Sequence, residues 1–283
     1  MTVDQEGEAE QAGGAGTART AGSGGALDGR TAVVTGAARG IGRVIAVALA
    51  RAGADLVVCS RQTGGLADVC AEVAALGRRV VPCAVDLEQP ERMAAMTTVA
   101  AEAFGGVDVL VNNSGEGGPS APLWEVDPAD WQRTIDVNLT GAFRCCQAVL
   151  PSMIERRRGS IVFIGSITGQ RPLLHRSPYA ASKLGLVGLC RTLALDAGPY
   201  GIRANVVSPG FVAGPRIDWV IARQAEAQGR SEDDVRSELE GQAPLRRLVS
   251  AEEVADAVVF LASDAARAVT GVDLNVAAGA VMY

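Results

Sequence analysis

The chain has 283 residues, of which 48% are apolar, so it is long enough to bury the core of one large α/β domain. Its formal charge of −6 argues against nucleic acid or an anionic membrane as the main partner. No apolar run approaches the ~20 residues of a membrane span, and no secretory signal is evident, which predicts a cytoplasmic protein.

The cysteine and histidine content excludes several kinds of site. None of the six cysteines forms a C-x-x-C pair, and most lie in apolar stretches, so they are interpreted as reduced, buried thiols. The single histidine, His175, cannot build a multi-histidine zinc site, so no metal is expected. A Ser-His-Asp hydrolase would need His175 as its base, but no G-x-S-x-G motif accompanies it.

Residues 1–26 are rich in Gly and Ala and are predicted to form a flexible tail, because they bury too little apolar surface to offset their ordering entropy. Beyond them, β-branched apolar runs predict buried strands at residues 31–35, 56–59, 80–85, 107–111, 161–164, 204–207 and 272–276. Helical patterns lie between the strands at residues 41–52, 66–76, 91–104, 129–157 and 179–197. This alternation predicts a single Rossmann-like α/β domain over residues 27–283, with a doubly wound, seven-stranded parallel sheet.

Residues 214–241 depart from the alternation. They are polar and helical in pattern, and they follow the carboxyl end of a strand, where ligands bind in this architecture. The segment is predicted to be a lid over the substrate, and a plain solvated helix pair is the alternative.

The run between the first strand and the first helix is Thr35-Gly36-Ala37-Ala38-Arg39-Gly40-Ile41-Gly42. Glycine there permits a sharp turn and a close approach of the backbone to a pyrophosphate, which a Cβ would obstruct. The helix N-terminus offers free N–H groups to the phosphates. Because strand, turn and helix follow in the required order, the run predicts a dinucleotide site.

The second strand ends at Ser60 and Arg61, where a site for NADH usually has an acidic residue. Arg61 and Arg39 both offer planar donors to a ribose 2′-phosphate. We therefore predict NADPH as the cofactor, the alternative being that Arg61 is a surface arginine without a ligand.

Tyr179 and Lys183 are four residues apart in a helical pattern, so they lie on one face. A phenol in water ionises near pH ~10, and a unit positive charge at about 4 Å supplies about 4 kcal/mol at an effective dielectric of about 20. One lysine is therefore enough to favour phenolate chemistry near neutral pH. Ser166, just past the strand at 161–164, can hold a substrate oxygen. A tyrosine and a lysine at this spacing also occur for structural reasons. The glycine run earlier in the chain favours the catalytic interpretation.

Together these residues resemble the short-chain dehydrogenase/reductase family, from about Leu27 to the C-terminus. The family's further motifs are matched by Asp86-Leu87, by Asn112-Asn113-Ser114-Gly115 in place of N-N-A-G, by Val137-Asn138-Leu139, by Tyr179-Ala-Ala-Ser-Lys183 and by Pro209-Gly210. Gly214 departs from the threonine often found there. Segment 214–241 also resembles the hydroxybutyrate-dehydrogenase-like branch, but no carboxylate site like that branch's is evident, so its substrate is not carried over.

The resemblance implies hydride transfer between NADPH and a carbonyl carbon, and the leading hypothesis is a ketoreductase that acts on a small polar ketone. Tyr179 would donate the proton, Lys183 would favour the phenolate and bind the nicotinamide ribose, and Asn138 would hold a relay water, so the implied catalytic residues are Asn138, Ser166, Tyr179 and Lys183. The candidate cofactor contacts are Gly36, Arg39, Gly40, Ile41, Gly42, Ser60, Arg61, Asp86, Leu87, Asn113, Tyr179, Lys183 and Val212. Many members are tetramers, so a homo-oligomer, tetramer or dimer, is expected.

Two other functions stay open. One is an NAD-dependent secondary alcohol dehydrogenase working in the oxidative direction, and the other is a non-catalytic nucleotide-sensing protein, which the intact proton-handling group disfavours. Arg171, His175 and Arg176 precede Tyr179 and are candidates to meet an anionic or polyhydroxylated substrate, or else solvated loop residues.

Overall fold

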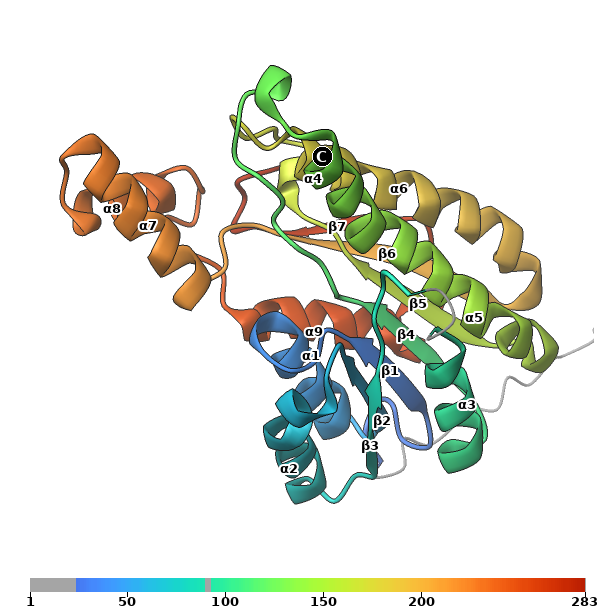
Figure 1. The fold of residues 1–283 in the computed structure, drawn as a ribbon. Coiled ribbons are helices and arrows are strands. Elements are labelled where there is room, and N and C mark those ends of the chain that lie inside the picture. Colours follow the sequence, from blue (N-terminus) through green and yellow to red (C-terminus); the bar gives the residue numbers. More distant parts are fainter. Residues whose placement is uncertain (1–23, 90–92, 283) are drawn as a thin grey trace, which may run out of the picture.

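The computed structural model describes residues 24–89 and 93–282, and its centre is a parallel sheet (Figure 1). The seven parallel strands confirm the predicted Rossmann-like sheet, and they follow the order β3-β2-β1-β4-β5-β6-β7. They are β1 (Thr31–Thr35), β2 (Asp55–Ser60), β3 (Val80–Ala84), β4 (Val109–Asn112), β5 (Gly159–Ile164), β6 (Ile202–Pro209) and β7 (Asp273–Val276).

Helices cover both faces of the sheet (Figure 1). On one face lie α1 (Gly40–Arg51), α2 (Ala67–Ala75) and α9 (Ala251–Ala262); on the other lie α3 (Met93–Phe104), α5 (Gly141–Arg156) and α6 (Ser177–Ala197). Successive residues of β1 serve the two cores in turn: Val34 packs under α1, whereas Val33 packs under the opposite layer. Both are fully buried, which explains the unbroken apolar runs of the strands.

The predicted helix at residues 129–157 is interrupted in the structure. It consists of α4 (Pro128–Ile135), a π-helical turn over Asp136–Thr140, and α5. Single π turns inside helices are frequent at functional sites, and this one contains Asn138, which is 1% exposed. The prediction of one regular helix was wrong, because helical periodicity does not register one extra residue in a turn.

Helix α9 was not predicted. The first two residues of the predicted helix at 91–104, and residues 1–23 of the predicted tail, lie outside the described residues. All six cysteines are free, and five are buried while Cys70 is half-buried, which confirms their interpretation.

Residues 214–241 form α7 (Pro215–Gln228) and α8 (Glu232–Gly241), a helical pair that stands out from the body of the molecule (Figure 1). The two helices bury an apolar contact of their own, with Ile217 and Ile221 from α7 against Val235 and Leu239 from α8. The predicted helical character of this segment is therefore confirmed. Within the described part of the chain, no helix has the length and apolar character needed to cross a membrane.

Candidate active site

The glycine run forms a tight loop between β1 and α1. Gly40 has a φ of +58° and no atom lies within 4 Å of the position that its Cβ would take, so the loop is open on that side. A Cβ on Gly42 would lie 2.3 Å from both Asn113 Nδ2 and the Gly36 carbonyl oxygen, so no other residue fits there. The loop is closed toward the protein and open outward, as a phosphate cradle requires.

Asn113 and Thr35 fix the shape of this loop. The Asn113 side chain donates to the carbonyl oxygens of Thr35 (2.9 Å) and Gly36 (3.1 Å). In return, the hydroxyl of Thr35 accepts from the backbone N–H groups of Asn113 and Ser114, both at 3.0 Å. The loop is thereby tied to the end of β4. The sequence predicted Asn113 as a backbone contact of the cofactor and missed that its side chain supports the cradle.

The N-terminus of α1 has free donors for a phosphate. Its N-cap residue, Arg39, is extended (φ −159°) and its side chain makes no capping bond. The N–H groups of the first turn, beginning with Gly40 and Ile41, therefore point out of the helix into the open side of the loop. The residues present fit a dinucleotide pyrophosphate.

The carboxyl end of β2 lies beside this cradle, since the Ala37 N–H donates to the Cys59 carbonyl at 3.0 Å. The end of β3 follows it, since the Val85 N–H donates to the Ser60 carbonyl at 2.9 Å. The Asp86 carboxylate accepts from the Glu88 N–H (3.1 Å) and from Gln89 Nε2 (3.3 Å), so it shapes its own turn. Leu87 is 7% exposed and belongs to the core under α5. The end of the sheet beside the cradle is thus held in a fixed shape.

Arg39 and Arg61 differ from these neighbours. Both are exposed, and neither forms a hydrogen bond or ion pair with the described residues. Ser60, directly before Arg61, uses its hydroxyl to donate to the Gln62 carbonyl at 2.5 Å. The two guanidiniums therefore keep all their donors for a ligand.

Asn138 joins the π turn to the loop after β4 and to α6. Its Nδ2 donates to the Glu116 carbonyl and to Ser182 Oγ, both at 3.0 Å, and its Oδ1 accepts from the Glu116 N–H at 2.8 Å. The Ser182 hydroxyl in turn donates to the Tyr179 carbonyl at 2.8 Å. Ser182 is fully buried. The sequence analysis did not identify it as a site residue, although its position directly before Lys183 was a signal that could have done so.

Lys183 is buried on the inner face of α6, with 5% of its surface exposed. Its Nζ donates to the Ile164 carbonyl at the end of β5 (2.9 Å) and lies 5.7 Å from the centre of the Tyr179 ring. Burial lowers the pKa of Lys183, the negative charge of an ionised Tyr179 opposes this, and the positive charge of Arg216 adds to the lowering. The lysine and tyrosine are thus electrostatically coupled in the protein interior.

Ser166 follows β5 and begins the turn Ile167–Gly169, where its hydroxyl accepts from the Thr168 N–H at 3.2 Å. That turn packs against α6. The structure therefore brings Asn138, Ser166, Tyr179 and Lys183 together around the first turns of α6.

The loop after β6 contributes Val212. A parallel bridge with Val249 uses the N–H of Ala213 (2.8 Å) and the carbonyl of Phe211 (2.9 Å). The N–H and C=O of Val212 itself point away from Val249, as alternation along an extended chain requires. They are therefore free to meet a ligand at this end of the sheet.

Three residues before Tyr179 are candidates for substrate contacts, and of these only Arg176 lies against the Tyr179 ring. Its guanidinium carbon lies 5.1 Å from the centre of the Tyr179 ring. His175 is exposed with a φ of +60°, and its carbonyl accepts from the Ala121 N–H at 3.2 Å. Within the described residues, the side chain of Arg171 forms no hydrogen bond with Tyr179. Arg171 is therefore interpreted as a loop residue.

A comparison with known proteins identifies relatives. A family model described as enoyl-(acyl carrier protein) reductase matches residues 36–281. The cis-4-hydroxycyclohexanecarboxylate dehydrogenase of Sinomonas cyclohexanicum is 39% identical over 215 residues, which are 76% of this chain and 82% of that protein. Among solved structures, a variant of the actinorhodin polyketide ketoreductase with NADPH is 35% identical with a TM-score of 0.85, covering 90% of this chain and 98% of that one. The NAD⁺-bound xylitol dehydrogenase is 30% identical with a TM-score of 0.85, covering 89% of this chain and 99% of that one.

The fold, the glycine loop and these relatives together define a nicotinamide-dependent oxidoreductase that acts on CH–OH and C=O groups. The chain belongs to the short-chain dehydrogenase/reductase family. The resemblance found in the sequence is therefore confirmed, as is the Rossmann-like fold.

Proposed function

We propose that the chain is an NADPH-dependent ketoreductase of a small polar ketone, with Tyr179 as the proton donor. The observation that carries the proposal is the buried Lys183 beside Tyr179, next to the end of β5. An ammonium group in the protein interior is costly unless it serves a nearby negative charge, and a tyrosine that gives up its proton supplies that charge.

When bound, the nicotinamide supplies a hydride to the carbonyl carbon. The hydroxyl of Tyr179 gives its proton to the carbonyl oxygen, and Lys183 stabilises the phenolate that is left. Ser166 Oγ holds the same oxygen by a hydrogen bond. Asn138 fixes Ser182 and, through it, the backbone of Tyr179, so it acts as a positioning residue as well as a candidate holder of a relay water.

The cradle residues would hold the pyrophosphate, with Gly40 and Ile41 donating from the start of α1 and Gly36 and Gly42 allowing its approach. Val212 and Asn113 would line the nicotinamide end with backbone groups. Arg39 and Arg61 would bind a ribose 2′-phosphate, because both keep their donors free of partners among the described residues. Ser60, Asp86 and Leu87 would shape the adenosine end.

The helical pair α7–α8 is proposed to cover the substrate as a lid, since it follows β6 at the ligand-binding end of the sheet. We also propose a homo-oligomer, tetramer or dimer, that pairs the long helices. Leu184 and Leu195 on α6 are 51% and 79% exposed, and Phe143 on α5 is 46% exposed, which is apolar surface for a partner to bury. Light scattering tests this proposal.

An NAD-dependent secondary alcohol dehydrogenase is the second candidate. Two of the proteins compared above carry dehydrogenase names, and the xylitol dehydrogenase structure contains NAD⁺. The distinction depends on Arg39 and Arg61, because the same fold and proton-handling group serve both directions.

The test is a panel of small polar ketones and the corresponding alcohols, read by nicotinamide absorbance with both cofactors. We expect ketone reduction with kcat/KM at least about 10-fold higher for NADPH than for NADH, from one or more charge-assisted bonds to the 2′-phosphate. A preference for NADH would establish the second candidate instead, and no turnover of any carbonyl or alcohol would overturn both.

A further inference from the structure

Two arginines from different elements meet beside Gly117. Arg176 immediately precedes α6, and Arg216 is the second residue of α7. A Cβ on Gly117 would lie 2.9 Å from Arg216 Nη2 and 3.1 Å from Arg176 Nη2. The absence of a side chain at this position thus lets both guanidiniums reach the same point of the backbone.

Both arginines face the proton-handling group. Arg176 lies against the Tyr179 ring, at 5.1 Å from its centre. Burial lowers the pKa of Arg176, the negative charge of an ionised Tyr179 opposes this, and Arg216 lowers it again. The same three causes, in the same order, act on the lowered pKa of Lys183. The positive charge of Arg216 therefore lowers the pKa of both basic groups beside Tyr179, Arg176 and Lys183.

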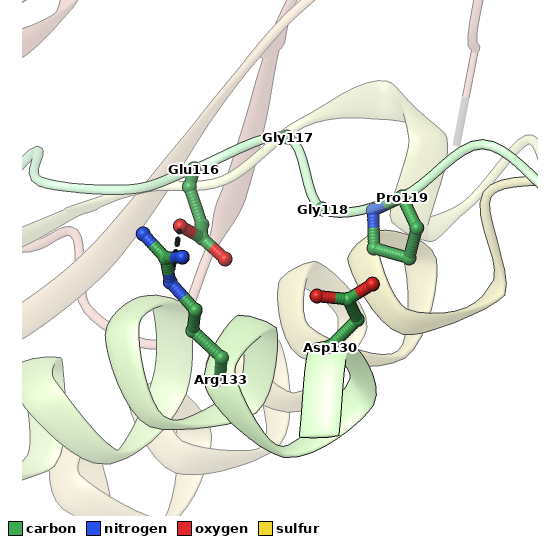
Figure 2. A pocket seen from close by; sticks show the side chains of 6 residues that line it. All are labelled: Glu116, Gly117, Gly118, Pro119, Asp130 and Arg133. Atoms are coloured by element: carbon green, nitrogen blue, oxygen red, sulfur yellow. Dashed lines mark ion pairs between the residues drawn. The ribbon is translucent and has the colours of Figure 1, made fainter. Parts of the chain in front are cut away.

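Glu116 and Asp218, the carboxylates closest in the chain to Gly117 and Arg216, are paired with other arginines. In the described part of the chain, Asp130, which lines the same hollow as Gly117, forms no ion pair with Arg176 or Arg216. Figure 2 shows the Glu116 carboxylate turned to Arg133, at 3.3 Å, in the open hollow between the loop and α4. Asp218, two residues after Arg216, pairs with Arg236 of α8 at 2.7 Å. Neither Arg176 nor Arg216 forms a hydrogen bond or ion pair with a carboxylate among residues 24–89 and 93–282. Two like charges are thus brought together without a carboxylate partner among the described residues.

The residues proposed to hold the cofactor phosphates stand on other elements. The cradle lies at the start of α1, and the free arginines Arg39 and Arg61 follow β1 and β2. Arg176 and Arg216, in contrast, stand on elements that follow β5 and β6, beside the residue that handles the proton. The missing anion therefore belongs to the substrate side.

We propose that Arg176 and Arg216 bind a carboxylate of the substrate, so that the enzyme's substrates are oxo acids and hydroxy acids. The guanidinium fork matches the two oxygens of a carboxylate, and two forks at one point favour it over a neutral polar group. This rests on the proposed function, because it locates the carboxylate on the molecule whose carbonyl meets Tyr179. Glycine at 117 leaves the room for it.

The test compares an acid with its neutral analogue in binding and in turnover. Calorimetry measures the binding of cyclohexanecarboxylate and cyclohexanecarboxamide to the full chain, with and without NADP⁺. Turnover uses 4-oxocyclohexanecarboxylate and its methyl ester. The variants are Arg216→Gln, which alters an exposed side chain, Arg176→Gln, and Arg176→Lys, which keeps the charge but loses the fork. Arg230→Gln removes one positive charge from the α7–α8 segment at a site paired with Glu238 and is the control.

We expect the acid to bind at least about 10-fold more tightly than the amide, and each Gln variant to reduce this preference about 10- to 100-fold. Arg176→Lys should retain part of it, and Arg230→Gln all of it. Equal affinities for acid and amide, no binding of the acid, or a preference that the Gln variants leave unchanged would each overturn the proposal. A loss of NADP⁺ affinity in the variants without loss of the acid preference would reassign the arginines to the cofactor.

A failure of the proposed function can be distinguished from a failure of the proposed carboxylate site. If the ester and other neutral ketones are reduced but no acid binds, the carboxylate site is wrong and the reductase stands. If the acid binds through the arginines but no ketone is reduced and no alcohol oxidised, the site stands and the proposed reaction is wrong.

Discussion

The two sides of the candidate site are built in opposite ways. On the cofactor side, the amide of Asn113 and the hydroxyl of Thr35 bond to backbone groups and hold the loop in shape without a ligand. On the substrate side, Arg176 and Arg216 converge without a carboxylate partner in the described residues. The first side is preorganised by the fold, whereas the second is proposed to be completed by an anionic substrate.

The largest expected effect tests the preorganised side. Gly42→Ala should abolish measurable binding of NADP⁺ and lower the free energy of unfolding by about 1–3 kcal/mol, because the new Cβ meets Asn113 and Gly36 at 2.3 Å. Urea unfolding and cofactor fluorescence measure the two losses. Gly188→Ala is the control: it lies in α6 with no atom within 4 Å of its Cβ position, and it should gain stability. Wild-type cofactor affinity in Gly42→Ala would mean that the loop is not the cradle.

A smaller effect is expected for Arg61, which, like Arg39, forms no ion pair with the described residues. Arg61→Ala should reduce the ratio of kcat/KM for NADPH over NADH about 10- to 100-fold, through loss of charge-assisted bonds to the 2′-phosphate. The activity with NADH should change little. Arg51→Ala, at the far end of α1, removes an equal charge and should leave the ratio unchanged. An unaltered ratio in Arg61→Ala would make Arg61 a surface residue.

The smallest effect concerns α9, which packs against α1 behind the cradle. Ser250 accepts from the Glu253 N–H (3.1 Å) while the Glu253 carboxylate accepts from the Ser250 N–H (2.8 Å), a capping box. Ser250→Ala should cost about 1 kcal/mol of unfolding free energy. The variant should still bind the cofactor, because Ser250 stabilises a helix behind the cradle and is not part of the cradle.

The same box carries a pH dependence. The hydrogen bond from Arg247, and then that from the Ser250 N–H, lower the pKa of Glu253 to about 2. Since the folded-state pKa lies below the unfolded one of about 4.3, this stability is present above pH ~4.3 and is lost as the pH falls toward about 2. Glu253→Gln should flatten acid unfolding in that window, and Glu252→Gln should not. If the unfolding free energies of the two variants depended on pH in the same way, Glu253 would not stabilise the helix cap.

The sequence predicts the glycine loop and the Tyr179–Lys183 pair well because the residues of each are close together in the chain, whereas the support of the loop by Asn113, 78 residues from Thr35, was missed. The glycines from 36 to 42, Tyr179 with Lys183, and the buried strands all have spacings that one backbone geometry enforces, and the structure arranges them accordingly. Helix α9 also had a local signal, the Ser250 and Glu253 capping box, which the sequence analysis did not use.

The substrate side was not predictable in this way. Gly117, Arg176 and Arg216 are far apart in the chain, and only the folded loops bring them to one point. The π turn at Asn138 was missed for a related reason, because its stabilising partners are the backbone of Glu116 and the hydroxyl of Ser182. Such contacts leave no periodic pattern in the sequence.

The most direct test of the proposed chemistry is the turnover of Tyr179→Phe, measured together with its affinity for NADP⁺ and with Tyr200→Phe as the matched control. Tyr200 lies at the far end of α6, in contact with Arg157. The predicted result is a loss of at least about 100-fold in kcat for Tyr179→Phe, with cofactor affinity retained and the control unchanged. Turnover at the wild-type rate in Tyr179→Phe would contradict the assignment of Tyr179 as the proton donor.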